Sequence, residues 1–247
     1  MGRSELVSQQ PLGVAEASAV AALGDGAFLV VSDEDGLFRC KLGAPPTHLA
    51  VSDKLTDLEG LCFIAERSEA LALTEHDASV WRFPLVDGEL APGHRLGSLP
   101  EIGTGHNSGW EGIAYAAAGV LADTDLLVAV HQERPRRIGL FDAKTLAERA
   151  ILRLPKDARK RLDDLNDVTV DPKTHHLLVL SGKAGCIAEL RLVGLELELV
   201  QLYPIETAKR DVPEGITFDP AGRLWIVTDG QGMLREIRLD KTSAAPT

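Results

Sequence analysis

An acidic residue recurs at the start of five similar segments of this chain. It is followed each time by a small or polar residue and an alternating apolar run, as in LEGLCFI, WEGIAYA and PEGITF. The acids lie 43, 52, 56 and 47 residues apart, and they are Glu16, Glu59, Glu111, Asp167 and Glu214. A period of this size is typical of propellers and solenoids. Carboxylates at equivalent points of such units would gather where the units converge, which indicates a cation site.

Carboxylates crowded together repel one another, so either some stay protonated or a cation neutralises them. Hard oxygen ligands with no cysteine nearby suit calcium or magnesium, and calcium tolerates irregular geometry best. We therefore expect all five acids to be metal ligands, with calcium as the ion and magnesium or another divalent ion as the alternative. The competing interpretation is that each acid accepts backbone N–H bonds from a neighbouring unit.

The elements that would position these acids are short strands. Each unit contains apolar alternating runs separated by turn signals such as Gly24-Asp25-Gly26 and Asp35-Gly36, as expected for antiparallel hairpins. The fold prediction is an all-β, five-bladed β-propeller with four-stranded antiparallel blades, forming one domain over residues 1–247. Six blades are the alternative if one long repeat hides an extra unit. The fifth unit has only three strands, so residues 4–10 are expected to supply its outer strand and close the ring.

Strand direction places further residues beside the acids. All innermost strands of a propeller run the same way, so their first residues share one channel mouth, and the second strands end on that same face. Histidines at such ends, or a carboxylate of the acidic ring, could take a proton from a metal-bound water, which makes His76 and His131 the candidate catalytic residues. Lys183 and Asp229 end other second strands and are candidate ligand-binding residues.

Loops entering the inner strands add polar and basic groups. The segment 101–110 offers His106, Asn107 and Trp110, and the hairpin of the third unit offers Arg134. An acidic channel with a basic rim could hold a metal and a small, anionic molecule such as a phosphoester or carboxylate. The competing interpretation is that these basic residues are solvated loop charges.

Composition narrows the class of protein. The net charge of −11 argues against nonspecific nucleic-acid binding, and no apolar run approaches the roughly 18 residues of a membrane span. The N-terminal segment lacks the apolar core of a signal peptide. Three cysteines without metal-ligand spacing are expected to be buried thiols. Together these features favour a cytoplasmic protein, with a mature secreted or periplasmic form as the alternative. The sequence makes no prediction of oligomeric state.

The chain resembles the SdiA-regulated family of β-propellers, the YjiK-like proteins. Four phrases carry the resemblance, which runs through residues 57–239: DLEGLCF, NSGWEGI, DLNDVTVDPKTHHLLVLS and PEGITFDPAGRLWIVTD. Propellers of the phytase-like esterase group have similar Glu-Gly strands. The resemblance implies a calcium-binding propeller whose ligands match Glu59, Glu111, Asp167 and Glu214. Glu16 matches by spacing only, because EASA replaces the Glu-Gly dipeptide there.

Two functional classes follow. The first is a metal-dependent hydrolase of an ester, lactone or phosphoester, and the second is a non-catalytic ligand- or protein-binding module with a structural ion. The chain contains no Gly-x-Ser-x-Gly elbow, HExxH helix or P-loop. The hydrolase hypothesis therefore depends on the predicted geometry of the mouth.

Overall fold

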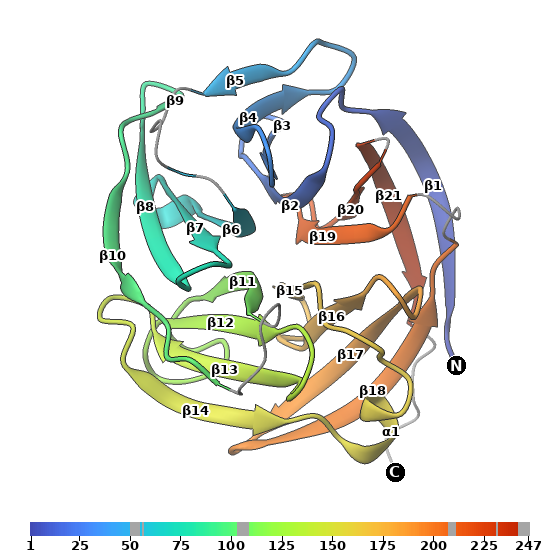
Figure 1. Ribbon diagram of the computed structural model, residues 1–247. Coiled ribbons are helices and arrows are strands. Elements are labelled where there is room, and N and C mark those ends of the chain that lie inside the picture. Colours follow the sequence, from blue (N-terminus) through green and yellow to red (C-terminus); the bar gives the residue numbers. More distant parts are fainter. Residues whose placement is uncertain (50–54, 56, 103–108, 207–210, 231, 242–247) are drawn as a thin grey trace.

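The computed structural model describes residues 1–49, 55, 57–102, 109–206, 211–230 and 232–241. Within these residues, five antiparallel sheets are arranged around a central axis as the blades of a propeller (Figure 1). In blades 1 to 4 the first strand in the chain lies near the axis and the last at the periphery, whereas in blade 5 the peripheral strand is the N-terminal β1. The prediction of five four-stranded blades is confirmed.

The strands follow one another outward in each blade. Blade 1 comprises β2 (Ala17–Ala22), β3 (Ala27–Ser32), β4 (Gly36–Lys41) and β5 (Thr47–Leu49). Blade 2 comprises β6 (Leu58–Ile64), β7 (Glu69–Thr74), β8 (Ser79–Val86) and β10 (His94–Ser98), with the short β9 (Glu89–Leu90) paired to β8. Blade 3 comprises β11 (Trp110–Ala116), β12 (Leu126–His131), β13 (Arg137–Asp142) and β14 (Glu148–Arg153). Blade 4 comprises β15 (Asp167–Val170), β16 (Leu177–Ser181), β17 (Cys186–Val193) and β18 (Glu196–Pro204).

Blade 5 combines the two ends of the chain. Its inner strands are β19 (Pro213–Phe218), β20 (Leu224–Thr228) and β21 (Met233–Asp240), and its outer strand is the N-terminal β1 (Arg3–Pro11). β1 pairs antiparallel with β21 over almost its whole length, so the unpaired edge that β21 would otherwise expose is covered. The prediction that residues 4–10 close the ring is confirmed.

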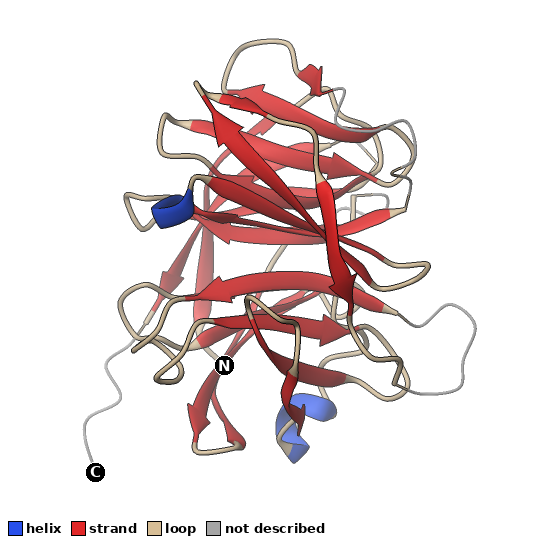
Figure 2. Cartoon of the chain, turned by 90° about the vertical axis from the view of Figure 1, so that its left-hand side faces the viewer, coloured by secondary structure: helices blue, strands red, loops and turns tan. Residues whose placement is uncertain are grey.

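Helix is confined, in the described part of the chain, to the 3-10 turn η1 (Ala65–Arg67) and the single turn α1 (Lys156–Arg159) (Figure 2). No helix among the described residues is long and apolar enough to cross a membrane.

The apolar core is divided into five clusters, one at each junction between neighbouring blades. Leu, Val, Ile and Ala supply most of the buried side chains, with a few large aromatics such as Trp110, Trp225 and Phe141. Burial of this apolar surface is the main force that holds the blades together. The three cysteines are free and buried, as expected.

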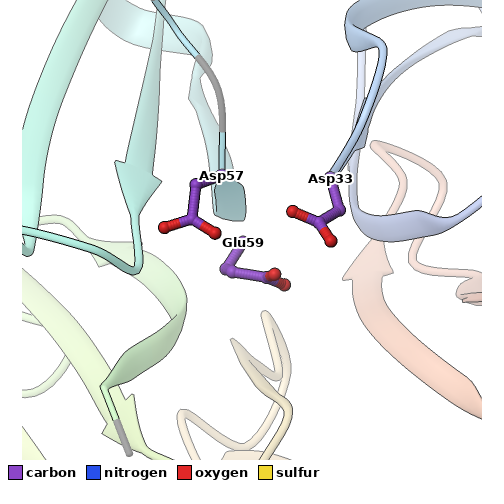
Figure 3. Close-up of side chains that lie close together, drawn as sticks. All are labelled: Asp33, Asp57 and Glu59. Atoms are coloured by element: carbon purple, nitrogen blue, oxygen red, sulfur yellow. The ribbon is translucent and has the colours of Figure 1, made fainter. Parts of the chain in front are cut away.

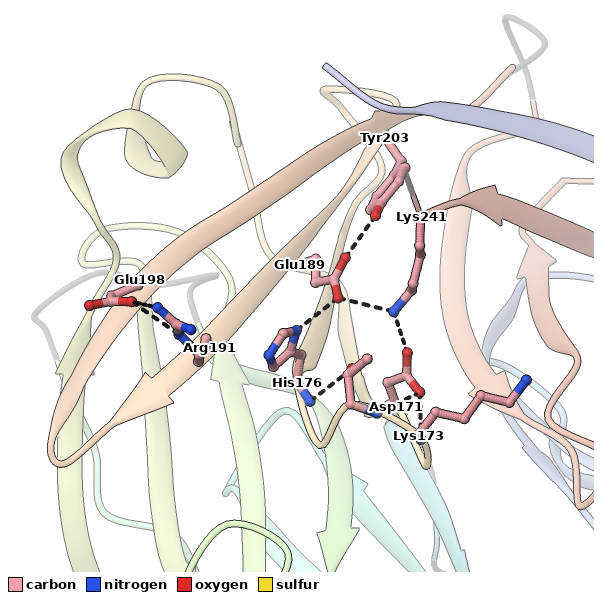
Figure 4. Close-up of polar contacts among 9 residues, drawn as sticks. Asp171, Lys173, His176, Glu189, Arg191, Glu198, Tyr203 and Lys241 are labelled. Atoms are coloured by element: carbon pink, nitrogen blue, oxygen red, sulfur yellow. Dashed lines mark hydrogen bonds and ion pairs between the residues drawn. The ribbon is translucent and has the colours of Figure 1, made fainter. Parts of the chain in front are cut away.

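A polar network adds to the packing where blades 4 and 5 meet (Figure 4). The Glu189 carboxylate, which is 3% exposed, accepts a hydrogen bond from Tyr203 Oη at 2.7 Å and lies 2.8 Å from His176 Nδ1. Lys241, just after β21, donates from Nζ to Glu189 at 3.0 Å and also to Asp171. Burial alone would raise the pKa of Glu189, but these hydrogen bonds outweigh it and lower that pKa. The network therefore fastens the end of blade 5 to blade 4.

Candidate metal centre

One mouth of the central channel holds a cavity of about 250 Å³ whose lining is almost entirely acidic. The lining residues are Glu16, Ser18, Asp33, Glu59, Glu75, Glu111, Gln132, Glu214 and Asp229. They come from the starts of inner strands and the ends of second strands, the two sets that strand direction predicted to share one face. Seven of the nine are carboxylates, and none of the described residues lining the cavity is basic.

In blades 2, 3 and 5, a β-bulge at the start of the inner strand directs an acid into the cavity. In blade 2, Leu58 pairs with Thr74 and Gly60 with Leu73, which leaves Glu59 as the extra residue. Glu214 occupies the same position in blade 5, between two paired residues of β19. In blade 3 the register shifts between Trp110 and Ile113, the interval that holds Glu111. A bulge turns one side chain out of the regular alternation, so each extra residue faces the channel.

The residue after each bulge lies where neighbouring inner strands approach most closely. A Cβ at Gly60 would lie 2.6 Å from the backbone oxygen of Glu111, and one at Gly112 would lie 2.2 Å from Asp167 Oδ1. A Cβ at Gly215 would lie 2.7 Å from the Cα of Ala19 in the next blade. The Glu-Gly dipeptide thus has two physical roles, because Glu supplies a channel carboxylate and Gly lets the next strand approach.

The register corrects the alignment of the repeats in blades 1 and 4. In blade 1 the extra residue is Ser18, because Ala17 pairs with Ser32 and Ala19 with Val31. Glu16 precedes the bulge by two residues, yet its side chain still lines the cavity.

In blade 4 the bulge position belongs to Asn166, since Asp167 pairs with Leu180 and the Asn166 N–H also donates to Leu180 O at 3.0 Å. Asn166 donates from Nδ2 to Glu214, and its Oδ1 accepts from the Gly182 N–H at 2.7 Å. The amide therefore connects blade 4 to the acid of blade 5.

Asp167 lies away from the acidic cavity. It is fully buried, and its two oxygens accept backbone hydrogen bonds from Val168 N at 2.8 Å and from Ile216 N of blade 5 at 2.7 Å. For this acid the structure supports the competing interpretation, in which the carboxylate joins neighbouring blades through their backbones.

Three acids come close enough to share one ion. Asp33, Asp57 and Glu59 each offer a carboxylate oxygen, and these oxygens all lie within 4.8 Å of one another (Figure 3). Asp57 precedes the bulge residue Glu59 by two positions, as Glu16 precedes Ser18. Both preceding residues have positive φ, 65° for Asp57 and 46° for Glu16. Sequence reasoning missed Asp57, because the residues at the same offset from the other two Glu-Gly dipeptides are Gly109 and Val212.

The crowding raises the pKa of several mouth carboxyls. Burial, followed by repulsion from Asp33 and Glu75, raises the pKa of Glu59 to about 8. Burial and the charge of Asp229 raise the pKa of Glu214 to about 8. Burial also raises the pKa of Asp33, Glu75 and Asp229.

Glu111 has its pKa raised well above the usual value, first by burial and then by the charge of Glu59. It shares a side-chain hydrogen bond with Glu75. Burial raises the pKa of both carboxyls, and repulsion from neighbouring acids adds to the effect, so this mouth is costly to ionise without a counter-charge.

The remaining sequence-predicted residues are spread around this site. His131 is 1% exposed, with Nδ1 3.0 Å from the Pro135 carbonyl oxygen and its ring 5.4 Å from that of Trp110. Burial lowers the pKa of His131. Trp110 is 1% exposed and donates from Nε1 to Pro100 O at 2.8 Å. Both residues belong to the interior of blade 3, and Gln132 lines the cavity instead.

His76 and Arg134 are exposed. The backbone N–H of His76 donates to Asp57 Oδ2 at 2.7 Å, so His76 lies beside the acidic triad but outside the cavity lining. Lys183 is exposed and pairs with Glu133. Asp229 lines the cavity and accepts from Val212 N at 2.8 Å. His106 and Asn107 lie outside the described residues.

The donor set fits a hard divalent cation. Carboxylates are accompanied by the Ser18 hydroxyl and the Gln132 side-chain amide, so the cavity lining offers oxygen donors and no sulfur or imidazole among the described residues. Calcium takes six to eight such oxygens in irregular geometry. Mutually repelling carboxylates gain most from an ion that replaces their protons.

Fold and site together define a five-bladed β-propeller with an acidic channel mouth. The chain belongs to the SdiA-regulated family, whose sequence profile matches residues 48–231. This confirms the resemblance drawn from residues 57–239.

Solved propellers share the architecture at low sequence identity. Glutaminyl cyclase of Myxococcus xanthus is 14% identical, with a TM-score of 0.67 and 97% of each chain covered. The PQQ-bound aldose sugar dehydrogenase of Streptomyces coelicolor is 13% identical, with a TM-score of 0.58 and coverage of 97% of this chain and 99% of that one. Likeness at this identity shows a common fold.

Proposed function

We propose that this protein binds a divalent cation, calcium foremost, in the acidic cavity and uses that ion to hold a small anionic molecule. One observation carries the proposal: seven carboxylates from four blades line a single cavity of about 250 Å³, without a basic side chain among its described lining residues. So many carboxylates gathered without a counter-charge are costly to ionise. A bound cation would remove that cost.

Asp33, Asp57 and Glu59 would hold the ion, because their oxygens already lie within 4.8 Å of one another. Glu59 is the central member, since it lines the cavity and stands on a bulge of the inner strand. Glu111 and Glu214 would complete the negative surroundings from blades 3 and 5. Membership of the SdiA-regulated family also supports calcium, because the resemblance to that family implies a calcium-binding propeller.

The uneven distribution of charge around the mouth supports an anion as the small molecule that the cation holds. Blades 1, 2, 3 and 5 present carboxylates to the cavity, whereas blade 4 presents the Asn166 amide to Glu214. Lys183, at the end of β16, is close enough for the charge of Glu214 to contribute to its raised pKa, which is due first to Glu133. An anion on the cation would therefore meet Lys183 on the blade 4 side.

Hydrolysis of an ester, lactone or phosphoester is a second candidate function. It is favoured by Glu214, which lines the cavity outside the three proposed ligands and whose pKa of about 8 suits proton transfer near neutral pH. The ion, when bound, would polarise the substrate oxygen and acidify a water. Glu214 would take the proton of that water, because His131 is 1% exposed and does not line the cavity.

Calorimetric titration of chelator-treated protein with calcium tests the binding proposal. We expect saturable binding by the wild type, at least tenfold weaker binding by Glu59→Gln, and unchanged binding by the control Glu89→Gln on the exposed β9. Absence of heat in the wild type, or equal affinity in all three proteins, would contradict the proposal.

A panel of nitrophenyl esters, phosphoesters and lactones then separates the two uses of the ion. Turnover that requires calcium and disappears in Glu59→Gln supports hydrolysis. Calcium binding without turnover on any of these substrates supports a non-catalytic binding module.

A further inference from the structure

The opposite mouth of the channel contains a second, larger cavity of about 440 Å³. Its lining comes from the far ends of the inner strands, whereas the acidic cavity is lined by their starts. The two cavities thus lie at opposite ends of one channel.

A layer of apolar side chains separates them. Two residues beyond each bulge position, the inner strands carry Val20, Leu61, Ile113, Val168 and Ile216, all 0–2% exposed. Four of these five also line the second cavity. These buried apolar side chains form the inner part of the cavity wall.

Two residues further along, all five blades contribute a half-buried side chain to the wall. These equivalent residues are Ala22, Phe63, Tyr115, Val170 and Phe218. The same strands that present carboxylates at one mouth thus present three aromatic rings, a valine and an alanine at the other. A pocket of this volume falls within the range of about 300–1,000 Å³ typical of small-molecule sites.

Most polar side chains around this second cavity already have hydrogen-bond partners within the protein. The Asp219 carboxylate accepts hydrogen bonds from Arg223 Nε at 2.7 Å and Trp225 Nε1 at 3.1 Å, besides backbone N–H groups. The Tyr115 hydroxyl bonds to Asp125. The Thr217 hydroxyl, by contrast, makes only a 3.4 Å contact with its neighbouring carbonyl oxygen, which leaves it available to a ligand.

Charge also restricts the class of ligand. Glu66 and Asp219 are the acidic residues of the described lining, which contains no Lys or Arg. The nearby guanidinium groups are engaged, Arg223 with Asp219 and Arg67 with Asp125 and the Tyr115 ring, so the described lining offers an anion only His175. A neutral molecule fits this surface best.

We propose that this second cavity, the apolar chamber, binds a small, uncharged and largely apolar molecule that inserts between Phe63, Tyr115 and Phe218 and bonds to Thr217. Its limited volume favours a small molecule over a folded partner. This site is separate from the cation site and does not depend on it.

The uncharged dye Nile red is a suitable probe, because its emission shifts to shorter wavelength in apolar surroundings. We expect a saturable blue shift with one dye per chain and no change in affinity when calcium is added. Val170→Arg places a charge in the chamber wall and should weaken binding at least tenfold. The matched control is Val200→Arg on β18 of the same blade, a valine that is 41% exposed on the outside, and it should bind like the wild type.

Ala22→Trp provides a second test if Val170→Arg does not fold, because the indole would occupy the chamber from its one small wall position. It should also weaken binding at least tenfold while circular dichroism stays unchanged. Absence of a saturable shift in the wild type overturns the proposal, as does unchanged affinity in Ala22→Trp. Loss of binding in Val200→Arg would also overturn it, because the dye would then sit on the outer surface.

Discussion

Replacing Glu59 by Gln should stabilise the chelator-treated protein at pH 7.5 while removing its response to calcium. Glu59 has a pKa of about 8 in the folded protein, against 4.5 for an ordinary glutamate. Gln has nearly the same shape and carries no charge. The substitution thus removes the cost of ionising this buried group and also removes a proposed ligand.

The sign and size follow from proton linkage. A carboxyl whose pKa is raised by folding contributes stability that is complete below about pH 4.5 and is lost as the pH rises through about 8. Each pH unit in that window costs about 1.4 kcal/mol per group. At pH 7.5 the cost approaches about 4 kcal/mol for Glu59 alone, and coupling to its acidic neighbours makes about 2–4 kcal/mol a realistic range.

Thermal unfolding between pH 5 and 8 measures the effect. For a chain of this length, about 3 kcal/mol corresponds to a rise in Tm of roughly 6–12 °C. We expect Glu59→Gln to melt higher than the wild type at pH 7.5 and at nearly the same temperature at pH 5. Calcium should raise the Tm of the wild type at pH 7.5 and have much less effect on the variant.

Glu89→Gln is the control, because Glu89 is exposed on β9. It should follow the wild type at every pH, with or without calcium. A Glu59→Gln protein that melts below the wild type at pH 7.5 would refute the reasoning. A wild type whose chelator-treated stability is flat between pH 5 and 8 would refute it equally.

Two further predictions concern the framework. Gly112→Ala should lower the free energy of unfolding by several kcal/mol in denaturant titrations, because its Cβ would lie 2.2 Å from Asp167 Oδ1. The control Gly24→Ala should be nearly neutral, since nothing lies within 4 Å of its Cβ. Equal effects of the two substitutions would show that the close approach of the inner strands is unimportant for stability. Lys241→Met should cost about 1–3 kcal/mol, since it removes a donor from the buried Glu189, and an unchanged Tm would show that the network does not fasten blade 5.

Much of the architecture could be predicted because it repeats. The spacing of the Glu-Gly phrases set the number of blades, and the missing strand of the fifth unit identified residues 4–10 as its complement. Strand direction then placed the starts of inner strands and the ends of second strands at one mouth. These inferences use only the order and direction of elements, which tolerate errors of one or two residues.

Predicting which side chains line the site requires the strand register to be correct to a single residue, and the sequence alone did not provide this register. A bulge adds one residue to a strand, and successive side chains of a strand face opposite sides. Aligning the repeats on acidic residues therefore put Asp167 in the position that Asn166 occupies. In the same way His131 was expected at the mouth, whereas the side chain that reaches it belongs to Gln132.

A crystal structure of the protein grown with calcium, with anomalous data collected at long wavelength, tests the central claim most directly. We expect an anomalous peak in the acidic mouth, at about 2.3–2.6 Å from carboxylate oxygens of Asp33, Asp57 and Glu59. A mouth without a peak at millimolar calcium would contradict it, and so would a calcium ion bound elsewhere while these three carboxylates bind only protons and water.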